Sequence, residues 1–217
     1  MAYPASDGIQ IVDLDTGAVT PLGHNTGLDL HWSPDGRQIA FVTAGEAYGI
    51  FVLSTMDSGL RQLSNLGYES IAGWSPDGQR LYYAIPSSSN DGFLLRAVDV
   101  TTGVTQDLFV LQDSSAKAPL PEVSPDGNWI AYRGRDNGSL YIMSMDGVQN
   151  HLVIEKPSLS LSHAINGIVW GPDGGLVGVS MITPDEQDGE VILMQWEACE
   201  AYRLPGVHGE LDGLLIP

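Results

Sequence analysis

The sequence contains a single cysteine, Cys199, among 217 residues. An intramolecular disulfide is therefore impossible, and a metal site built from several cysteine thiolates is excluded. Positive charge is also scarce, because 9 Lys and Arg residues stand against 27 Asp and Glu residues, a formal net charge of −18. A surface of this sign repels the phosphates of nucleic acid and of anionic lipid, so nucleic-acid binding is not expected.

Long apolar runs are absent as well. No stretch approaches the roughly 20 apolar residues that cross a bilayer, so membrane insertion is not expected. No long segment repeats its apolar residues with the period of a helix. The 26 Gly and 13 Pro residues instead favour many tight turns. The acidic surface suits a basic protein partner or cations, although acidity also serves solubility alone.

One short motif recurs four times and organises the chain. Each copy reads Trp or Val, then Ser or Gly, then Pro-Asp-Gly, and an apolar segment follows it. The prolines of successive copies lie 42, 49 and 47 residues apart. This period matches one four-stranded propeller blade of about 40–50 residues. The copies begin at Trp32, Trp74, Val123 and Trp170.

The chemistry of each copy fits a tight turn between two strands. Pro presets φ, Asp accepts a hydrogen bond from its own backbone two residues on, and Gly adopts positive φ. A polar fourth strand, such as residues 60–63 or 104–108, is expected to form the outer edge of each unit. Apolar third strands are expected at residues 50–53, 93–95, 140–143 and 191–194.

The two ends of the chain supply a fifth unit. Residues 1–22 align with the last three strands of a repeat, and residues 213–217 align with a first strand, with Pro217 lying 45 residues after Pro172. The sequence therefore predicts an all-β fold: a five-bladed β-propeller of four-stranded antiparallel blades, one of them closed by pairing the N- and C-terminal strands. Residues 1–217 are expected to form a single domain. The alternative is a segment excised from a longer repeat array.

These four units resemble the WD40-like Pro-Asp (PD40) repeats of the TolB propeller family, over essentially the whole chain. The resemblance implies a bacterial protein-binding propeller in the periplasm or outside the cell. Similar repeats also form propellers attached to prolyl-oligopeptidase-like peptidases, and propeller lyases. The copies depart from the pattern at Val123 and Gly171 without threatening the fold. The resemblance makes four aspartates structural rather than ligand-binding: Asp35, Asp77, Asp126 and Asp173.

The loops that lead into the first strand of each blade are expected to line the mouth of a central channel and to bind the ligand. Three of their histidines fall at equivalent positions and, with nearby carboxylates, have the chemistry of divalent-metal ligands. The simpler interpretation is a solvent-exposed rim, so neither a metal nor a cofactor is predicted. The mouth residues are His24, Asn25, Asp29, Tyr68, Glu69, Lys117, His163, Asn166, His208, Glu210 and Asp212.

Enzyme motifs are lacking: neither a phosphate-binding Gly loop nor a Gly-x-Ser-x-Gly elbow is present. Ser33, Ser75 and Ser124 occupy repeated turns, where a nucleophilic role is not expected. We therefore predict a monomeric, non-catalytic scaffold that binds a protein or peptide partner, favouring basic ones. The alternatives are a metal-assisted, lyase-like carbohydrate-active enzyme that uses the mouth histidines, and a structural fragment without a ligand of its own.

The five tryptophans are assigned by their place in the repeat. Trp32, Trp74, Trp129 and Trp170 are expected in the core between blades, and Trp196, at the end of a third strand, is expected to be partly exposed.

Overall fold

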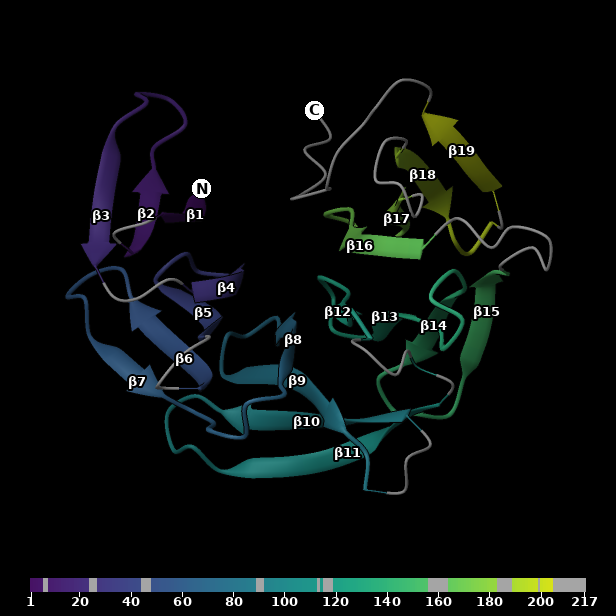
Figure 1. Ribbon diagram of the computed structural model, residues 1–217, viewed down its shortest axis with the longest axis horizontal. Coiled ribbons are helices and arrows are strands. Elements are labelled where there is room, and N and C mark those ends of the chain that lie inside the picture. The colour runs from purple at the N-terminus through teal and green to yellow at the C-terminus, as the bar shows by residue number, and fades with distance from the viewer. Residues whose placement is uncertain are drawn as a thin grey trace. The chain divides into compact units, whose positions relative to one another are not determined.

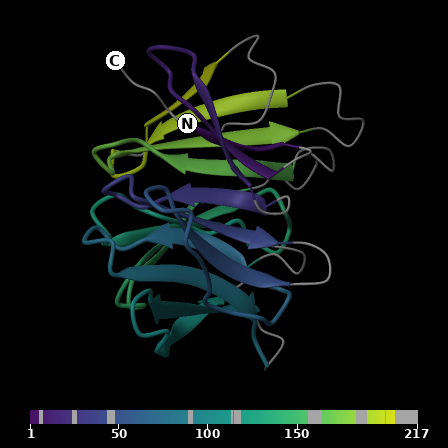
Figure 2. The same cartoon turned by 90° about the vertical axis from the view of Figure 1, so that its left-hand side faces the viewer.

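The computed structural model describes residues 1–5, 8–23, 27–43, 48–88, 92–112, 114, 119–155, 164–182, 189–198 and 200–204. Within these ranges every regular element is a β-strand, and the strands form five sheets (Figures 1 and 2). The chain is an all-β, five-bladed β-propeller, as the repeat period predicts.

Strands that follow one another in the sequence are neighbours in every sheet, so each blade is a simple meander. The first blade comprises β1 (Ala2–Ala5), β2 (Gly8–Val12) and β3 (Val19–Gly23). The second comprises β4 (Gly27–Trp32), β5 (Gln38–Thr43), β6 (Gly49–Ser54) and β7 (Leu60–Gln62). The third comprises β8 (Ser70–Trp74), β9 (Arg80–Pro86), β10 (Gly92–Asp99) and β11 (Thr105–Gln112).

The fourth blade comprises β12 (Glu122–Val123), β13 (Trp129–Arg133), β14 (Leu140–Ser144) and β15 (Asn150–Ile154). The fifth comprises β16 (Ala164–Trp170), β17 (Leu176–Ile182), β18 (Gly189–Gln195) and β19 (Glu200–Leu204). The last strand of each blade lies at an edge, as its polar sequence predicts. Residues 213–217, the predicted closing strand of the first blade, lie outside the described residues.

A serine and an aspartate hold the repeated turn. In the second copy the Ser75 hydroxyl donates to Asp77 Oδ1 (2.6 Å) and accepts from the Arg80 amide (2.9 Å). Asp77 Oδ1 also accepts from the amide two residues on, at 3.0 Å, which confirms the predicted bond. Gly78 has φ +68°. The turns at Ser33 and Ser124 repeat these bonds.

Apolar side chains fill the space between neighbouring sheets. Ile9 of β2 packs with Phe41 of β5 in one cluster, and Ile142 of β14 packs with Val179 of β17 in another. These clusters belong to different compact units, and strands β9, β10 and β11 each contribute residues to both units. The prediction of a single domain therefore stays a prediction. The units are residues 1–83 with 97–106, and residues 84–96 with 107–217.

Two tryptophans of the repeat motif tie adjacent blades together within each unit. The Trp74 indole N–H donates to the His31 carbonyl at 3.0 Å, and the Trp170 indole N–H donates to the Glu122 carbonyl at 2.7 Å. Both side chains are buried, as expected for residues between blades. Burying the ring while pairing its polar N–H avoids the cost of an unsatisfied donor.

One expectation for the tryptophans is wrong, because Trp196 is buried at 7% exposure and donates to the Gly174 carbonyl. Trp32 and Trp129 are half-buried, and each packs against a core cluster as expected. Trp129 does so from a different position: it follows the Pro-Asp-Gly turn of the third copy, while Val123 occupies the anchor position that Trp fills in the other copies. Trp129 therefore begins a second strand, at the turn end of its blade.

Candidate binding site at the mouth loops

Asp29 lies on a β-bulge near the start of β4. The register with β5 runs from Leu28↔Val42 to His31↔Ala40, so β4 carries one residue more than its partner there. Asp29 adopts φ +57°, a conformation that Asp tolerates better than most residues. Bulges re-aim side chains and are common beside functional sites.

The Asp29 carboxylate joins two neighbouring blades of the first unit. Its Oδ2 accepts from the Ile71 amide of β8 at 3.1 Å, and its Oδ1 lies 2.9 Å from His31 Nε2. Sequence reasoning placed Asp29 among the mouth residues but missed His31. No sequence signal pointed to His31, because the alternation of faces along a regular strand does not hold across the bulge. The arrangement provides an oriented, partly exposed carboxylate.

Glu69 directly precedes β8 of the next blade, close to the repeat position that Asp29 occupies in its own blade, but its side chain has a different environment. The side chain is 8% exposed, and Oε1 accepts from the Ser64 hydroxyl and from the Leu66 amide (2.8 Å). These bonds close the segment between β7 and β8. Its Oε2 is buried without a hydrogen-bond partner among the described residues. Glu69 thus shapes the loop, and one of its oxygens is unsatisfied.

Two large exposed side chains, Leu66 and Tyr68, lie on this segment, and a third, Tyr48, lies directly before β6. We call these three residues the aromatic patch. The exposed fractions of Tyr48, Leu66 and Tyr68 are 55%, 48% and 77%. A Cβ built on Gly67 would lie 3.5 Å from Tyr48 Cβ, which places Tyr48 against the chain between the other two residues. The patch lies at the end of the blades where β6 and β8 begin, the end that also carries Asp29.

The second unit repeats the bulge at Asn166. The register of β16 with β17 shifts between Ile165 and Gly167, so Asn166 is the extra residue. Arg133 Nη1 donates to the Ile165 carbonyl at 2.7 Å. Burial lowers the pKa of the Arg133 guanidinium, which nevertheless stays protonated at neutral pH. Sequence reasoning missed Arg133 because it ends a second strand rather than lying in a mouth loop.

The remaining predicted mouth residues lie outside the described residues, so their grouping stays a prediction. Among the residues that the structure does describe, no cluster of three His, Cys, Asp or Glu side chains could hold a metal ion. No helix of that described part is long and apolar enough to cross a membrane. The undescribed mouth residues are His24, Asn25, Lys117, His163, His208, Glu210 and Asp212.

The strand order and repeated turns define a β-propeller scaffold, and its fold is that of the TolB-like propellers. TolB from Acinetobacter baumannii aligns with a TM-score of 0.75 and 18% identity, over 96% of this chain and 52% of that one. An oligogalacturonate lyase in complex with manganese aligns with a TM-score of 0.62 and 15% identity, over 94% of this chain and 61% of that one. At these identities the likeness establishes the fold alone.

The sequence comparisons add one relative. The peptidase YuxL of Bacillus subtilis, described as uncharacterized, is 33% identical over 85 residues, which is 37% of this chain and 13% of that protein. No protein-family model matches the chain. The chain therefore spans about half the length of the TolB structure and a small part of the peptidase.

Proposed function

We propose that this chain is a non-catalytic, protein- or peptide-binding propeller whose mouth loops contact the partner. The aromatic patch of Tyr48, Leu66 and Tyr68 is the observation that carries the proposal. Folded proteins expose such side chains singly without consequence, whereas a cluster beside polar groups is typical of an interaction site. Tyrosine is also enriched among the residues that dominate interface energies.

Charge supports the same function. The net charge of −18 favours basic partners and accelerates their encounter at low ionic strength. The Asp29 carboxylate lies at the same end of the blades as the patch, and its hydrogen bond to Ile71 fixes its position. The tyrosines of the patch supply an apolar contact, and the oriented Asp29 carboxylate supplies a charged contact at the same end of the blades.

Substituting the patch tests this function. Immobilised wild-type protein and a Tyr48→Ser, Tyr68→Ser double variant are compared for capture of a partner that is then identified and titrated in purified form. The control is Val104→Ser, since Val104 is 67% exposed in the turn before β11, away from the mouth loops. We expect the double variant to lose binding and the control to keep it. Equal affinity of the double variant would contradict the proposal.

The likeness to a manganese-bound oligogalacturonate lyase favours a second candidate, a metal-assisted carbohydrate-active enzyme that uses His24, His163 and His208. Metal analysis of protein purified without an affinity tag, and the change in thermal stability on adding Mn²⁺, distinguish the two. Metal bound to the wild-type protein and lost in His163→Ala would support the enzyme. A wild-type protein that binds no metal would support the binding scaffold. A periplasmic or extracellular location, implied by the sequence resemblance, is part of the first proposal.

A further inference from the structure

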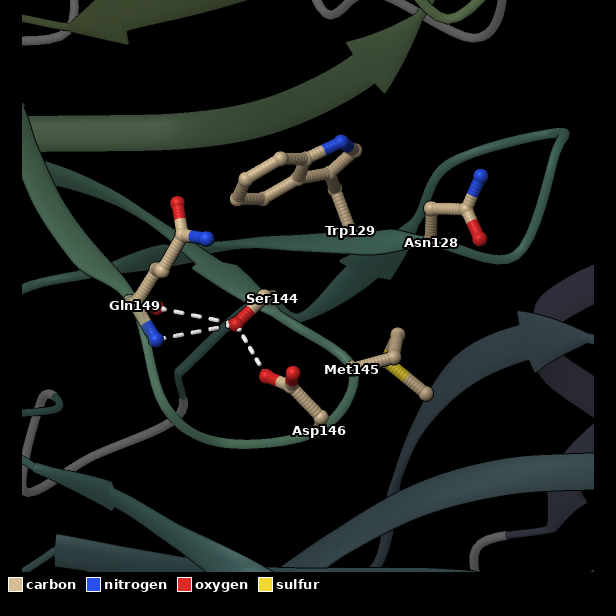
Figure 3. Close-up of a pocket in the computed structure, with 6 residues that line it drawn as sticks. All are labelled: Asn128, Trp129, Ser144, Met145, Asp146 and Gln149. Carbon is tan, nitrogen blue, oxygen red and sulfur yellow. Dashed lines mark hydrogen bonds between the residues drawn. The ribbon is translucent and has the colours of Figure 1, made fainter.

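A pocket lies at the turn end of the fourth blade, the end opposite its mouth loops. Two turns form it: the Pro-Asp-Gly turn between β12 and β13, and the turn between β14 and β15 (Figure 3). Its volume is about 360 Å³. The lining residues are Asn128, Trp129, Ser144, Met145, Asp146 and Gln149.

Trp129 gives the pocket an aromatic wall. Its ring meets the Trp196 ring edge to face, with centroids 4.6 Å apart and planes at 64°, and this contact anchors it. The Trp129 indole N–H has no hydrogen-bond partner among the described residues, unlike those of Trp74, Trp170 and Trp196. Trp129 is also half-buried rather than buried. Part of the indole therefore remains available to a ligand.

Asp146 gives the pocket a fixed negative charge. Its Oδ1 accepts from the Ser144 hydroxyl and, at 3.0 Å, from the Val148 amide. These bonds, the one from Ser144 first, hold the pKa of the Asp146 carboxyl below its usual value. Its Oδ2 makes no hydrogen bond to any described residue. In Figure 3 the carboxylate borders the pocket from one turn and the Trp129 indole borders it from the other.

We propose that this pocket binds a lysine or arginine side chain of a partner protein. The cation would lie against the Trp129 ring, where the ring quadrupole attracts it, and would pair with Asp146 Oδ2. Neither lysine nor arginine lines the pocket, so no cation of this chain competes among the lining residues. The Asn128 side-chain nitrogen donates to Asp126 Oδ2 at 2.7 Å, so its carbonyl oxygen supplies a further acceptor, whereas Gln149 Oε1 already lies 3.4 Å from His151 Nε2.

The repeat shows that this combination is particular to the fourth blade. Gln38, Arg80 and Leu176 occupy the position of Trp129 in the other copies. Asp57 stands in the equivalent outer turn of the second blade, where Gln38 replaces the tryptophan. The turn itself needs only the aspartate, so Trp129, which also packs against Trp196, is the residue that distinguishes this pocket from the turns of the other blades.

Small probes test the pocket directly. Nα-acetyl-lysine methylamide and Nα-acetyl-arginine methylamide are titrated into the ¹⁵N-labelled full chain, with the norleucine analogue and methyl glucoside as neutral probes. The Trp129 indole signal is assigned from its loss in Trp129→Gln, which places the Gln of the second blade at this position. We expect the cationic probes to shift this signal saturably and the neutral probes to leave it unchanged.

Matched variants make the result specific. Asp146→Asn keeps an acceptor for Ser144 and removes the charge, so we expect binding about three- to tenfold weaker; Asp57→Asn should leave it unchanged. Equal affinity in Asp146→Asn, an equal shift with norleucine, or a shift with methyl glucoside alone would overturn the proposal. The proposal rests on the protein-binding function, but the patch variant Tyr48→Ser, Tyr68→Ser should bind these probes normally, so the two ideas fail separately.

Discussion

Replacing Ser75 with alanine tests the hydrogen bonds that hold the repeated turn. Ser75 is 5% exposed, and its hydroxyl donates to Asp77 Oδ1 and accepts from the Arg80 amide. Alanine removes both bonds. Losing a buried hydrogen bond and leaving its partner unsatisfied costs about 1–3 kcal/mol. For a chain of this size that unfolds in one transition, this corresponds to a fall in Tm of roughly 2–12 °C.

The pH dependence gives this prediction a second readout. The bond from Ser75 is the largest cause that holds the pKa of Asp77 below its usual value. A lowered folded-state pKa stabilises the fold above the unfolded value of about 3.9, and the effect disappears as the pH falls through the lowered pKa. We therefore expect the difference in Tm between wild type and Ser75→Ala to be largest near pH 7 and to shrink in acid.

The assay is thermal unfolding from pH 7 to pH 3, with the Asp77 carboxyl pKa followed by NMR. The control is Ser88→Ala, because Ser88 is exposed and makes no hydrogen bond to a described residue. The Asp77 pKa should rise toward its usual value in Ser75→Ala and not in the control. A Tm equal to that of the control, or an unchanged Asp77 pKa, would refute this account of the turn.

Three further substitutions probe the fold. A Cβ on Gly49 (φ +134°) would lie 1.9 Å from the Ser64 carbonyl oxygen, so Gly49→Ala should cost about 2–4 kcal/mol of unfolding free energy. Gly36 (φ +69°) has nothing within 4 Å of such a Cβ, so Gly36→Ala should cost only about 1 kcal/mol. Urea unfolding compares the two variants. Trp170→Phe removes the indole donor to the Glu122 carbonyl and should cost about 0.5–1.5 kcal/mol in the same assay. A loss no larger than experimental error would show that the indole bond is dispensable.

The fold was predictable because the repeat fixes both the turns and their spacing. Pro-Asp-Gly identifies a turn by local backbone chemistry alone, and the period sets four strands to a blade. The bounds of β6, β14 and β18 contain the predicted third strands for the same reason. The burial of Ser75 was not predictable in this way, because serine at a turn is polar, and only the structure shows its hydroxyl bonded inward.

The candidate site was predictable only in part. Alignment on the repeat predicts that Asp29 and Tyr68 lie near the start of a first strand, and β4 and β8 begin at Gly27 and Ser70. It could not show that Glu69 turns inward to close its own loop, because burial depends on which amides lie nearby. The Trp129 pocket was missed because Trp129 was grouped with the anchor tryptophans, although Val123 holds that position.

In this repeat the residues shared by the copies stabilise the turns, whereas the residues that differ between copies are the candidates for binding. Asp35, Asp77 and Asp126 each bond a serine and a backbone amide of their own turn, so the shared acid is already used to fold the blade. Under the proposed function, the binding contacts come from positions where one copy departs from the others. Asp29 stands where the next copy has Ile71, and its carboxylate bonds the amide of that residue. Trp129 and Tyr68 also differ from the residues at the equivalent positions of the other copies, and each places a partly or largely exposed aromatic ring on the shared blade structure.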